Sequence, residues 1–117
     1  MKDKEKIAEL AAEFESCQKI LTALGDEVRQ HIIMQMMLYG KDCNGMRVPE
    51  ITMLTHLSRP AVSHHLQILK DAGVVKVRRE GTMNYYYFAS DNSIEKLIRA
   101  LQHADDIIKA LPDRSGE

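Results

Sequence analysis

Apolar residues recur at helical spacing near both ends of the chain. Between residues 7 and 24 they alternate in steps of three and four, the spacing of an amphipathic helix with a narrow apolar face. This first set is Ile7, Leu10, Phe14, Cys17, Leu21 and Leu24. The second set, over residues 93–111, is Ile94, Leu97, Leu101, Ala104, Ile108 and Leu111. The sequence therefore predicts one amphipathic helix at each end.

The chain between these helices begins with a different pattern. Gly25 and Asp26 interrupt the first apolar set, and residues 27–39 then predict a second helix. Its apolar residues cover broad faces rather than one stripe, which indicates burial; they are Val28, Ile32, Ile33, Met36 and Met37. Residues 39–45 collect turn formers and predict a loop.

Two short helices are predicted next, separated by a tight turn. The first runs from Val48 to Thr55. Ser58 can cap the free amides of a second helix, and Pro60 is tolerated in a first turn, where its missing N–H would be unpaired. A helix beginning at Arg59 would place Val62, Leu66 and Leu69 on its buried side and end before Gly73. Residues 48–72 thus predict a helix-turn-helix.

A β-hairpin is predicted directly after this motif. Residues 74–79 and 83–88 are rich in β-branched and aromatic side chains, and the turn formers at 80–82 separate them. A hairpin over residues 74–89 in this position is the wing of a winged helix-turn-helix. We therefore expect residues 1–117 to form one mainly α-helical domain with a small β-hairpin.

The exposed side of the helix at Arg59 suits the major groove of DNA, which admits an α-helix and displays a distinct pattern of base edges. Arg59 can pair with guanine, Ala61 can touch a thymine methyl, and Ser63 and His64 can hydrogen-bond bases or phosphates. Wing arginines suit phosphates or the minor groove. The predicted DNA-binding set is Ser58, Arg59, Ala61, Ser63, His64, Gln67, Lys70, Arg78, Arg79, Thr82 and Asn84. The alternative is an ordinary solvated helix face beside a charged hairpin.

The distribution of charge agrees with this placement. The net charge of the chain is −1, but residues 58–88 carry five basic and two acidic side chains, whereas residues 1–30 and 89–117 are both acidic on balance. A nucleic-acid-binding protein needs positive charge on one face rather than in total. The middle of the chain is therefore the predicted DNA-binding part.

The two terminal amphipathic helices predict a homodimer. In a chain of this size two narrow apolar faces are hard to bury on one core, so pairing of residues 1–24 and 93–111 with a second copy is the simplest solution. The predicted interface residues are Ile7, Leu10, Phe14, Cys17, Leu21, Ile94, Leu97, Leu101, Ala104 and Ile108.

Other functional classes find little support in the sequence. It has no recognisable catalytic nucleophile, acid–base pair or cofactor loop, so we do not expect an enzyme. No apolar stretch is long enough to span a bilayer, and the first residues carry charge where a signal peptide needs an apolar region. We expect a cytoplasmic protein without a membrane partner.

Two runs of the sequence resemble a known family. They are LTALGDEVRQHI, from Leu21 to Ile32, and LSRPAVSHHLQILKDAGVVKVRREGTMNYYYF, from Leu57 to Phe88. Both are similar to the ArsR/SmtB family of winged-helix repressors. The resemblance implies a dimer built from the first and last helices, binding to double-stranded operator DNA, and release when an inducer binds. The alternative function is a winged-helix protein-interaction module that does not bind an operator.

The metal sites of the family are represented only in fragments. The helix before Arg59, in the stretch MRVPEITML at residues 46–54, lacks the C-x-C pair that metal-binding members use there. For the site between paired last helices, the weak candidates are Asp91, His103 and Asp106, and the alternative for His103 is a plain surface histidine. No cofactor is assigned, and the inducer is a metal ion or a small molecule.

The remaining candidates for sensing are thiols and methionines. Thiol-sensing members carry a cysteine at the position of Met34 and another in the last helix, which has none here. Cys17 and Cys43 remain weak redox candidates, with Cys17 alternatively a small core residue. Met34, Met36, Met37, Met46 and Met53 either line a pocket for an organic ligand or tetrapyrrole or fill the core. His64 and His65 point about 100° apart on a helix, so with His56 they predict DNA contact and packing rather than a metal cluster.

Overall fold

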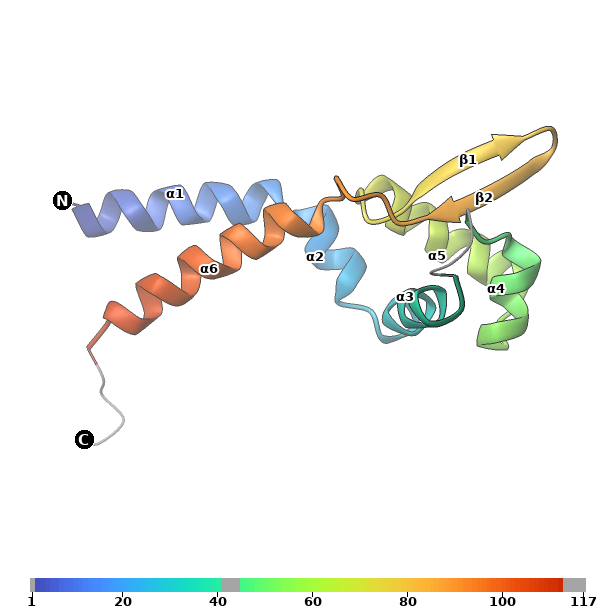
Figure 1. Cartoon of the computed structure of the whole chain (residues 1–117). Helices are drawn as coiled ribbons and strands as arrows, with labels where there is room; N and C mark the ends of the chain where they lie inside the picture. Colours follow the sequence, from blue (N-terminus) through green and yellow to red (C-terminus); the bar gives the residue numbers. More distant parts are fainter. Residues whose placement is uncertain (1, 41–44, 113–117) are drawn as a thin grey trace.

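The computed structural model describes residues 2–40 and 45–112, which form six helices and one two-stranded antiparallel sheet (Figure 1). The elements are α1 (Lys2–Ser16), α2 (Gln18–Leu24), α3 (Glu27–Gly40), α4 (Val48–Thr55), α5 (Arg59–Asp71), β1 (Lys76–Glu80), β2 (Met83–Tyr87) and α6 (Ile94–Ala110). The expected fold class, mainly helical with a β-hairpin after a helix-turn-helix, is confirmed.

The first helix is not continuous, contrary to the prediction from its apolar spacing. The chain leaves helical geometry at Cys17, which separates α1 from α2. This break lets Cys17 and the side of α2 that carries Ile20 and Ala23 face the core, where all three residues are at most 3% exposed. The steps of three and four continue across Cys17 in the sequence, so the spacing gave no sign of the change in direction.

The core lies where α2, α3, α4 and α5 meet. Val62, Leu66 and Leu69 on α5 are fully buried, as the sequence predicted, and they join Ile32 of α3 and Ile51 of α4 in one apolar cluster. Burial of such side chains contributes about 1.5–3 kcal/mol each, so this cluster fixes α5 against the other helices.

Helix α3 is buried on one side only. Ile32, Ile33 and Met36 are buried, but Val28 and Met37 are 37% and 43% exposed, so the expected burial of its whole apolar surface is wrong. Helices α2, α4 and α5 all contact α3, and these contacts leave Val28 and Met37 partly exposed.

The wing is a tight hairpin that packs on the domain through β2. Glu80 pairs with Met83 across the turn, and Gly81 adopts a φ of 61° there, a conformation that favours glycine. Met46, just before α4, forms an isolated bridge with Tyr86, with both backbone hydrogen bonds at 2.8 Å. The wing is therefore anchored beside the helix-turn-helix.

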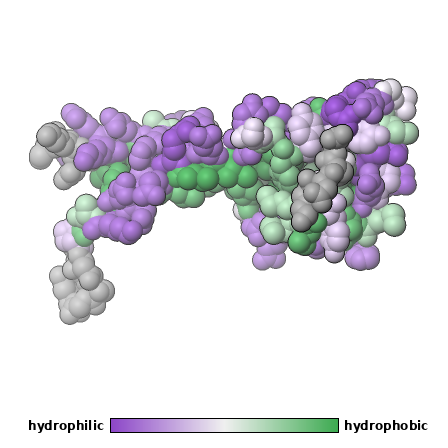
Figure 2. All heavy atoms as spheres, viewed as in Figure 1, coloured by the Kyte–Doolittle hydropathy of each residue, from purple (hydrophilic) through white to green (hydrophobic). Residues whose placement is uncertain are grey.

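Helices α1 and α6 form an arm that projects from the domain (Figure 1). The molecule measures 57 × 29 × 25 Å and has a radius of gyration of 18.0 Å, against about 13 Å for a compact domain of this length. Figure 2 shows an apolar strip along the arm between polar outer surfaces. No helix in the described ranges is long and apolar enough to cross a membrane.

Candidate nucleic-acid interface

Helix α5, the predicted recognition helix of the helix-turn-helix, begins with the expected cap. Ser58 has an extended backbone and its Oγ accepts a hydrogen bond from the amide of Ala61 at 3.2 Å, with Pro60 in the first turn. Ser58, Arg59 and Pro60 are all exposed. The helix therefore presents its N-terminal turn to solvent while its opposite side is held in the core.

Most side chains predicted to face DNA are exposed on α5. Arg59, Ser63, His64, Gln67 and Lys70 are exposed, and Ala61 is half-buried beside them. Gln67 donates from Nε2 to Asp71 Oδ1 at 2.9 Å, one turn further along the same face. The amide of Gln67 is thus engaged within the helix, while Arg59 and His64 lie nearer the N-terminal end that enters a major groove in helix-turn-helix proteins.

The wing arginines lie on opposite faces of the hairpin, because successive side chains of a strand alternate. Arg78 pairs across the strands with Tyr85 and lies over its ring at 4.6 Å, and it also forms an ion pair with Glu80. Arg79 pairs in register with Asn84 and donates from Nε to the carbonyl of Gly81 at 3.0 Å. Thr82 and Asn84 are exposed near the turn. Arg78 is therefore held by its neighbours more closely than the sequence suggested.

A buried arginine that the sequence analysis did not single out lies directly behind α5. Arg29, 8% exposed in the first turn of α3, approaches His65 of α5 with Nη1 to Nδ1 at 3.3 Å. Burial lowers the pKa of His65 from its ordinary value. Asp26 caps α3 by accepting from the Arg29 amide at 3.0 Å, and this hydrogen bond lowers the pKa of the Asp26 carboxyl. A sequence signal existed only for the cap, an aspartate directly before an apolar helix.

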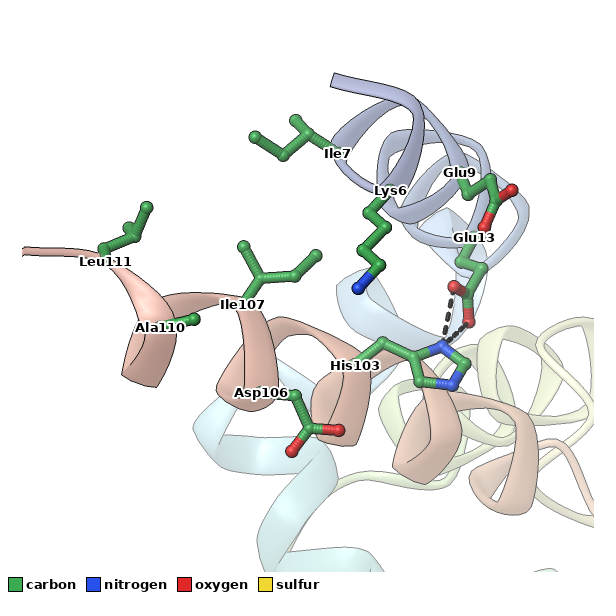
Figure 3. Close-up of a pocket in the computed structure, with 9 residues that line it drawn as sticks. All are labelled: Lys6, Ile7, Glu9, Glu13, His103, Asp106, Ile107, Ala110 and Leu111. Carbon is green, nitrogen blue, oxygen red and sulfur yellow. Dashed lines mark hydrogen bonds and ion pairs between the residues drawn. The ribbon is translucent and has the colours of Figure 1, made fainter. Parts of the chain in front are cut away.

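Of the metal candidates, His103 and Asp106 line the same pocket on α6 and Asp91 does not, and each of the three has another partner. His103 on α6 contacts both carboxylate oxygens of Glu13 on α1 at 2.8 Å (Figure 3). Asp106 accepts from Gln102 at 2.9 Å, and Asp91, before the start of α6, accepts from Lys76 at 3.0 and 3.1 Å. The hydrogen bond from Lys76 lowers the pKa of Asp91. Within residues 2–40 and 45–112 no group of three or more metal-ligating side chains is brought together.

A pocket of about 410 Å³ lies between α1 and α6, around the His103–Glu13 pair (Figure 3). It is lined by Lys6, Ile7, Glu9, Glu13, His103, Asp106, Ile107, Ala110 and Leu111. Its walls mix charged and aliphatic side chains, and it opens along the arm rather than beside the recognition helix.

The methionines divide between a second pocket and the surface. Met36, Met37 and Met46 line a pocket of about 330 Å³ between the end of α3 and β2, together with Gly40, Gly45, Tyr86, Tyr87 and Phe88. Met36 and Met46 are also buried in the core, at 3% and 4% exposed. Met34 and Met53 are 51% and 77% exposed and do not line the pocket, so both expected roles, pocket lining and core filling, are wrong for these two.

Cys17 is 1% exposed in the core, which shields its thiol from oxidants, and Cys43 lies outside the described residues. The described residues therefore do not test the predicted redox pair of Cys17 and Cys43.

The predicted dimer residues fall into three groups. Ile7, Leu101 and Ile108 are exposed by 49%, 48% and 64%. Leu10, Phe14, Leu21, Ile94 and Ala104 are half-buried. Cys17 and Leu97 are buried within the protomer, at 1% and 7%, because the break at Cys17 and the first turns of α6 fold onto the core; they leave almost no surface for a partner. This corrects their expected place at the interface.

Three comparisons with known proteins agree with this architecture. The family model described as "Bacterial regulatory protein, arsR family" matches residues 26–77. An uncharacterized HTH-type transcriptional regulator of Methanocaldococcus jannaschii is 36% identical over 86 residues, covering 74% of this chain and 91% of its own. A homologue of the cadmium resistance regulatory protein CadC from Staphylococcus aureus is 31% identical over 90 residues, covering 76% and 70%.

The fold also matches a solved structure. The domain described as a homodimeric winged helix-turn-helix DNA-binding domain from Mycobacterium bovis, a possible ArsR-family regulator, superimposes with a TM-score of 0.59 at 26% identity, covering 89% of this chain and 92% of its own. The similarity extends over most of both chains, so it includes the arm helices as well as the helix-turn-helix.

Proposed function

This chain belongs to the ArsR family of winged helix-turn-helix regulators, and on that premise we propose that it is a homodimeric repressor that binds operator DNA through α5. The observation that carries the proposal is the division of α5 into two sides. One side is fully buried at Val62, Leu66 and Leu69, and the other exposes hydrogen-bonding side chains from Arg59 onward.

The exposed side of α5 has the chemistry that base recognition needs. A major groove about 12 Å wide accepts an α-helix, and a guanidinium can pair with O6 and N7 of guanine. Arg59 stands at the first position of the helix, where it is exposed, and Ser63 and His64 follow one turn later. We assign Arg59 to base recognition and Ser63 and His64 to bases or adjacent phosphates.

The wing supplies positive charge beside the groove. Arg79 and Asn84 form one cross-strand pair near the turn, and Arg78 lies on the other face. Such side chains contact phosphates or the minor groove, which positions a protein on DNA without specifying sequence. We assign Arg79, Asn84 and Thr82 to this role ahead of Arg78, which is paired with Glu80.

The arm supports a homodimer. Ile7, Leu101 and Ile108 leave apolar surface exposed on α1 and α6, and a two-fold partner would cover it. The M. bovis relative is described as homodimeric. A dimer would place two α5 helices in successive major grooves about 34 Å apart, on a near-palindromic operator.

Repression would be relieved by an inducer, either a metal ion or a small molecule. The arm pocket beside His103 and Glu13 is the place where a bound inducer would act on the dimer, because both arm helices line it. The S. aureus relative is named for cadmium resistance, which makes divalent cations the first inducers to try.

The test is a fluorescence-anisotropy titration of the purified protein against the DNA upstream of its own gene, with a scrambled duplex as the control. Each duplex is measured at two salt concentrations, with and without Zn²⁺. The proposal expects tighter binding to the upstream DNA and a steep loss of affinity with salt, because bound Lys and Arg release phosphate counterions. Equal affinity for both duplexes, or no binding to either, would contradict it and favour a protein-interaction module.

A further inference from the structure

The recognition helix is tied to the corner between α2 and α3 by one buried guanidinium. Arg29 donates from Nε to the carbonyl of Ala23 at 2.8 Å and from Nη2 to the carbonyl of Thr22 at 3.0 Å. These carbonyls belong to the last turn of α2, where the helix has no backbone donors left to satisfy them. Nη1 lies 3.3 Å from Nδ1 of His65 on α5. One side chain therefore joins α2, α3 and α5.

The contact with His65 requires a neutral imidazole. A guanidinium can only donate hydrogen bonds, so Nδ1 of His65 must accept, and its proton must sit on Nε2. A protonated His65 would present a second N–H to the guanidinium and add a like charge beside it. The contact with Arg29 would then be lost.

The charges around His65 come from both sides of this contact. Asp26, before α3, and Arg29, in its first turn, face His65 from one side, and His64 precedes it on α5 with the two rings 5.6 Å apart. Asp26 lies near the guanidinium, with Oδ2 at 3.8 Å from Nη1. The carboxylate partly offsets the charge of Arg29.

We propose that Arg29 and neutral His65 position the recognition helix relative to α2, and that acid releases α5 from this position and weakens operator binding. The inference rests on the proposed DNA-binding function, but it assigns a role to two residues that need not touch DNA. His65 is half-buried on the side of α5 that faces Arg29, whereas its neighbour His64 is exposed on the DNA-facing side. Helix α1 of the arm leads directly into α2. The contact between Arg29 and His65 therefore also lies between the recognition helix and the dimerisation surface.

The direction of the pH effect follows from burial. Burial lowers the pKa of His65 below its ordinary value of 6.5, so the ring is neutral above that value and accepts from Arg29. As pH falls through this lowered pKa the ring takes up a proton and the contact is lost. Asp26 does not titrate in this window, because its pKa is lowered from 3.8.

A variant that lacks the neighbouring His64 allows a controlled experiment on His65. Operator affinity is measured by fluorescence anisotropy from about pH 7.5 to about pH 5.5 at constant ionic strength, within the range where histidine titrates. The measurement uses the full chain carrying His64→Gln, which removes the neighbouring imidazole from the DNA-facing side, with and without His65→Asn. Asparagine can place an amide oxygen near the position of Nδ1 and accept from Arg29, but it has no proton to gain.

The proposal expects operator affinity of His64→Gln to fall by roughly tenfold on acidification, the size of one charge-assisted hydrogen bond. The double variant His64→Gln/His65→Asn should bind like His64→Gln at neutral pH and lose much less affinity in acid. His65→Leu, which cannot accept, should already be weak at neutral pH while its light-scattering mass stays that of the unmodified protein. Circular dichroism at each pH ensures that only folded protein is compared.

The outcomes separate this proposal from the function on which it rests. Specific binding with the same acid loss in both histidine backgrounds would overturn the role of His65 and leave operator binding intact. Full neutral-pH affinity in His65→Leu would overturn it as well. Absence of operator binding by the unmodified protein at every pH would instead count against the proposed function.

Discussion

The recognition end and the arm leave opposite kinds of side chain in contact with solvent. On α5 Val62, Leu66 and Leu69 are fully buried, and apart from Pro60 the exposed positions from Arg59 to Lys70 are polar or charged. On the arm, Ile7, Leu101 and Ile108 are each about half exposed or more, beside charged neighbours. One protomer covers the apolar side of α5 by itself, but it leaves the apolar strip of the arm uncovered.

This difference shows which partner each surface suits. A polar, donor-rich helix face gains by exchanging water for base edges and phosphates. An exposed apolar strip gains by leaving water altogether, which a second copy of the same strip allows. The molecule is elongated because α1 and α6 extend beyond the core that the other helices form.

The largest effect is expected from a charge placed on the arm. Leu101→Glu would bury a carboxylate against the partner, so the protein should become monomeric and lose roughly a hundredfold or more in operator affinity, as bivalent contact is lost. Light scattering after size exclusion gives the mass, and anisotropy gives the affinity. Ala8→Glu, an exposed position of α1 outside the predicted interface set with the same added charge, is the control; equal loss in both variants would refute the interface.

A smaller and more specific loss is expected from the recognition helix. Arg59→Ala should weaken operator binding by about 1–3 kcal/mol and reduce discrimination between sequences, while the mass of the protein stays unchanged. His64→Ala should act in the same direction. Arg99→Ala removes an equally charged, exposed side chain from α6 and should leave affinity unaltered. Operator affinity unchanged by Arg59→Ala would mean that this face of α5 does not contact DNA.

The N-terminal cap of α5 should affect the stability of the protein more than its contact with DNA. Ser58→Ala removes the hydrogen bond to the amide of Ala61 and should lower the free energy of unfolding by about 0.5–2 kcal/mol in a urea titration. Ser63→Ala is the matched control, because Ser63 is exposed within the helix. Similar losses in both variants would show that the cap does not stabilise this helix.

The smallest effect is expected in the wing. Arg79→Ala should weaken binding to all duplexes alike and reduce the slope of log affinity against log salt by about 1. Arg78→Ala should do less, because Arg78 is already engaged with Glu80 and Tyr85. The measurement is the salt dependence of the affinity of both variants for operator and scrambled DNA. A larger change in slope for Arg78→Ala than for Arg79→Ala would reverse the assignment of the two wing faces.

Local chemistry made the helix-turn-helix predictable from the sequence. A capping serine and a proline define the start of α5, and Gly81 permits the turn between the strands, so these features depend on a few adjacent residues. The break at Cys17 was not predictable, because the apolar spacing continues across it. The contact of Arg29 with His65 joins positions 36 apart and depends on how α3 packs on α5. Long-range packing, rather than local sequence preference, determines both the break at Cys17 and the contact of Arg29 with His65.

The most direct test of a dimer with two recognition helices is the spacing of its half-sites. Operator duplexes are compared in which the distance between half-sites is native, longer by about half a helical turn, and longer by about one full turn of 10–10.5 base pairs. The half-turn insertion should abolish most of the specific affinity, because the second half-site moves to the opposite face of the DNA, and the full-turn insertion should cost less. Equal affinity for all three duplexes would contradict the account.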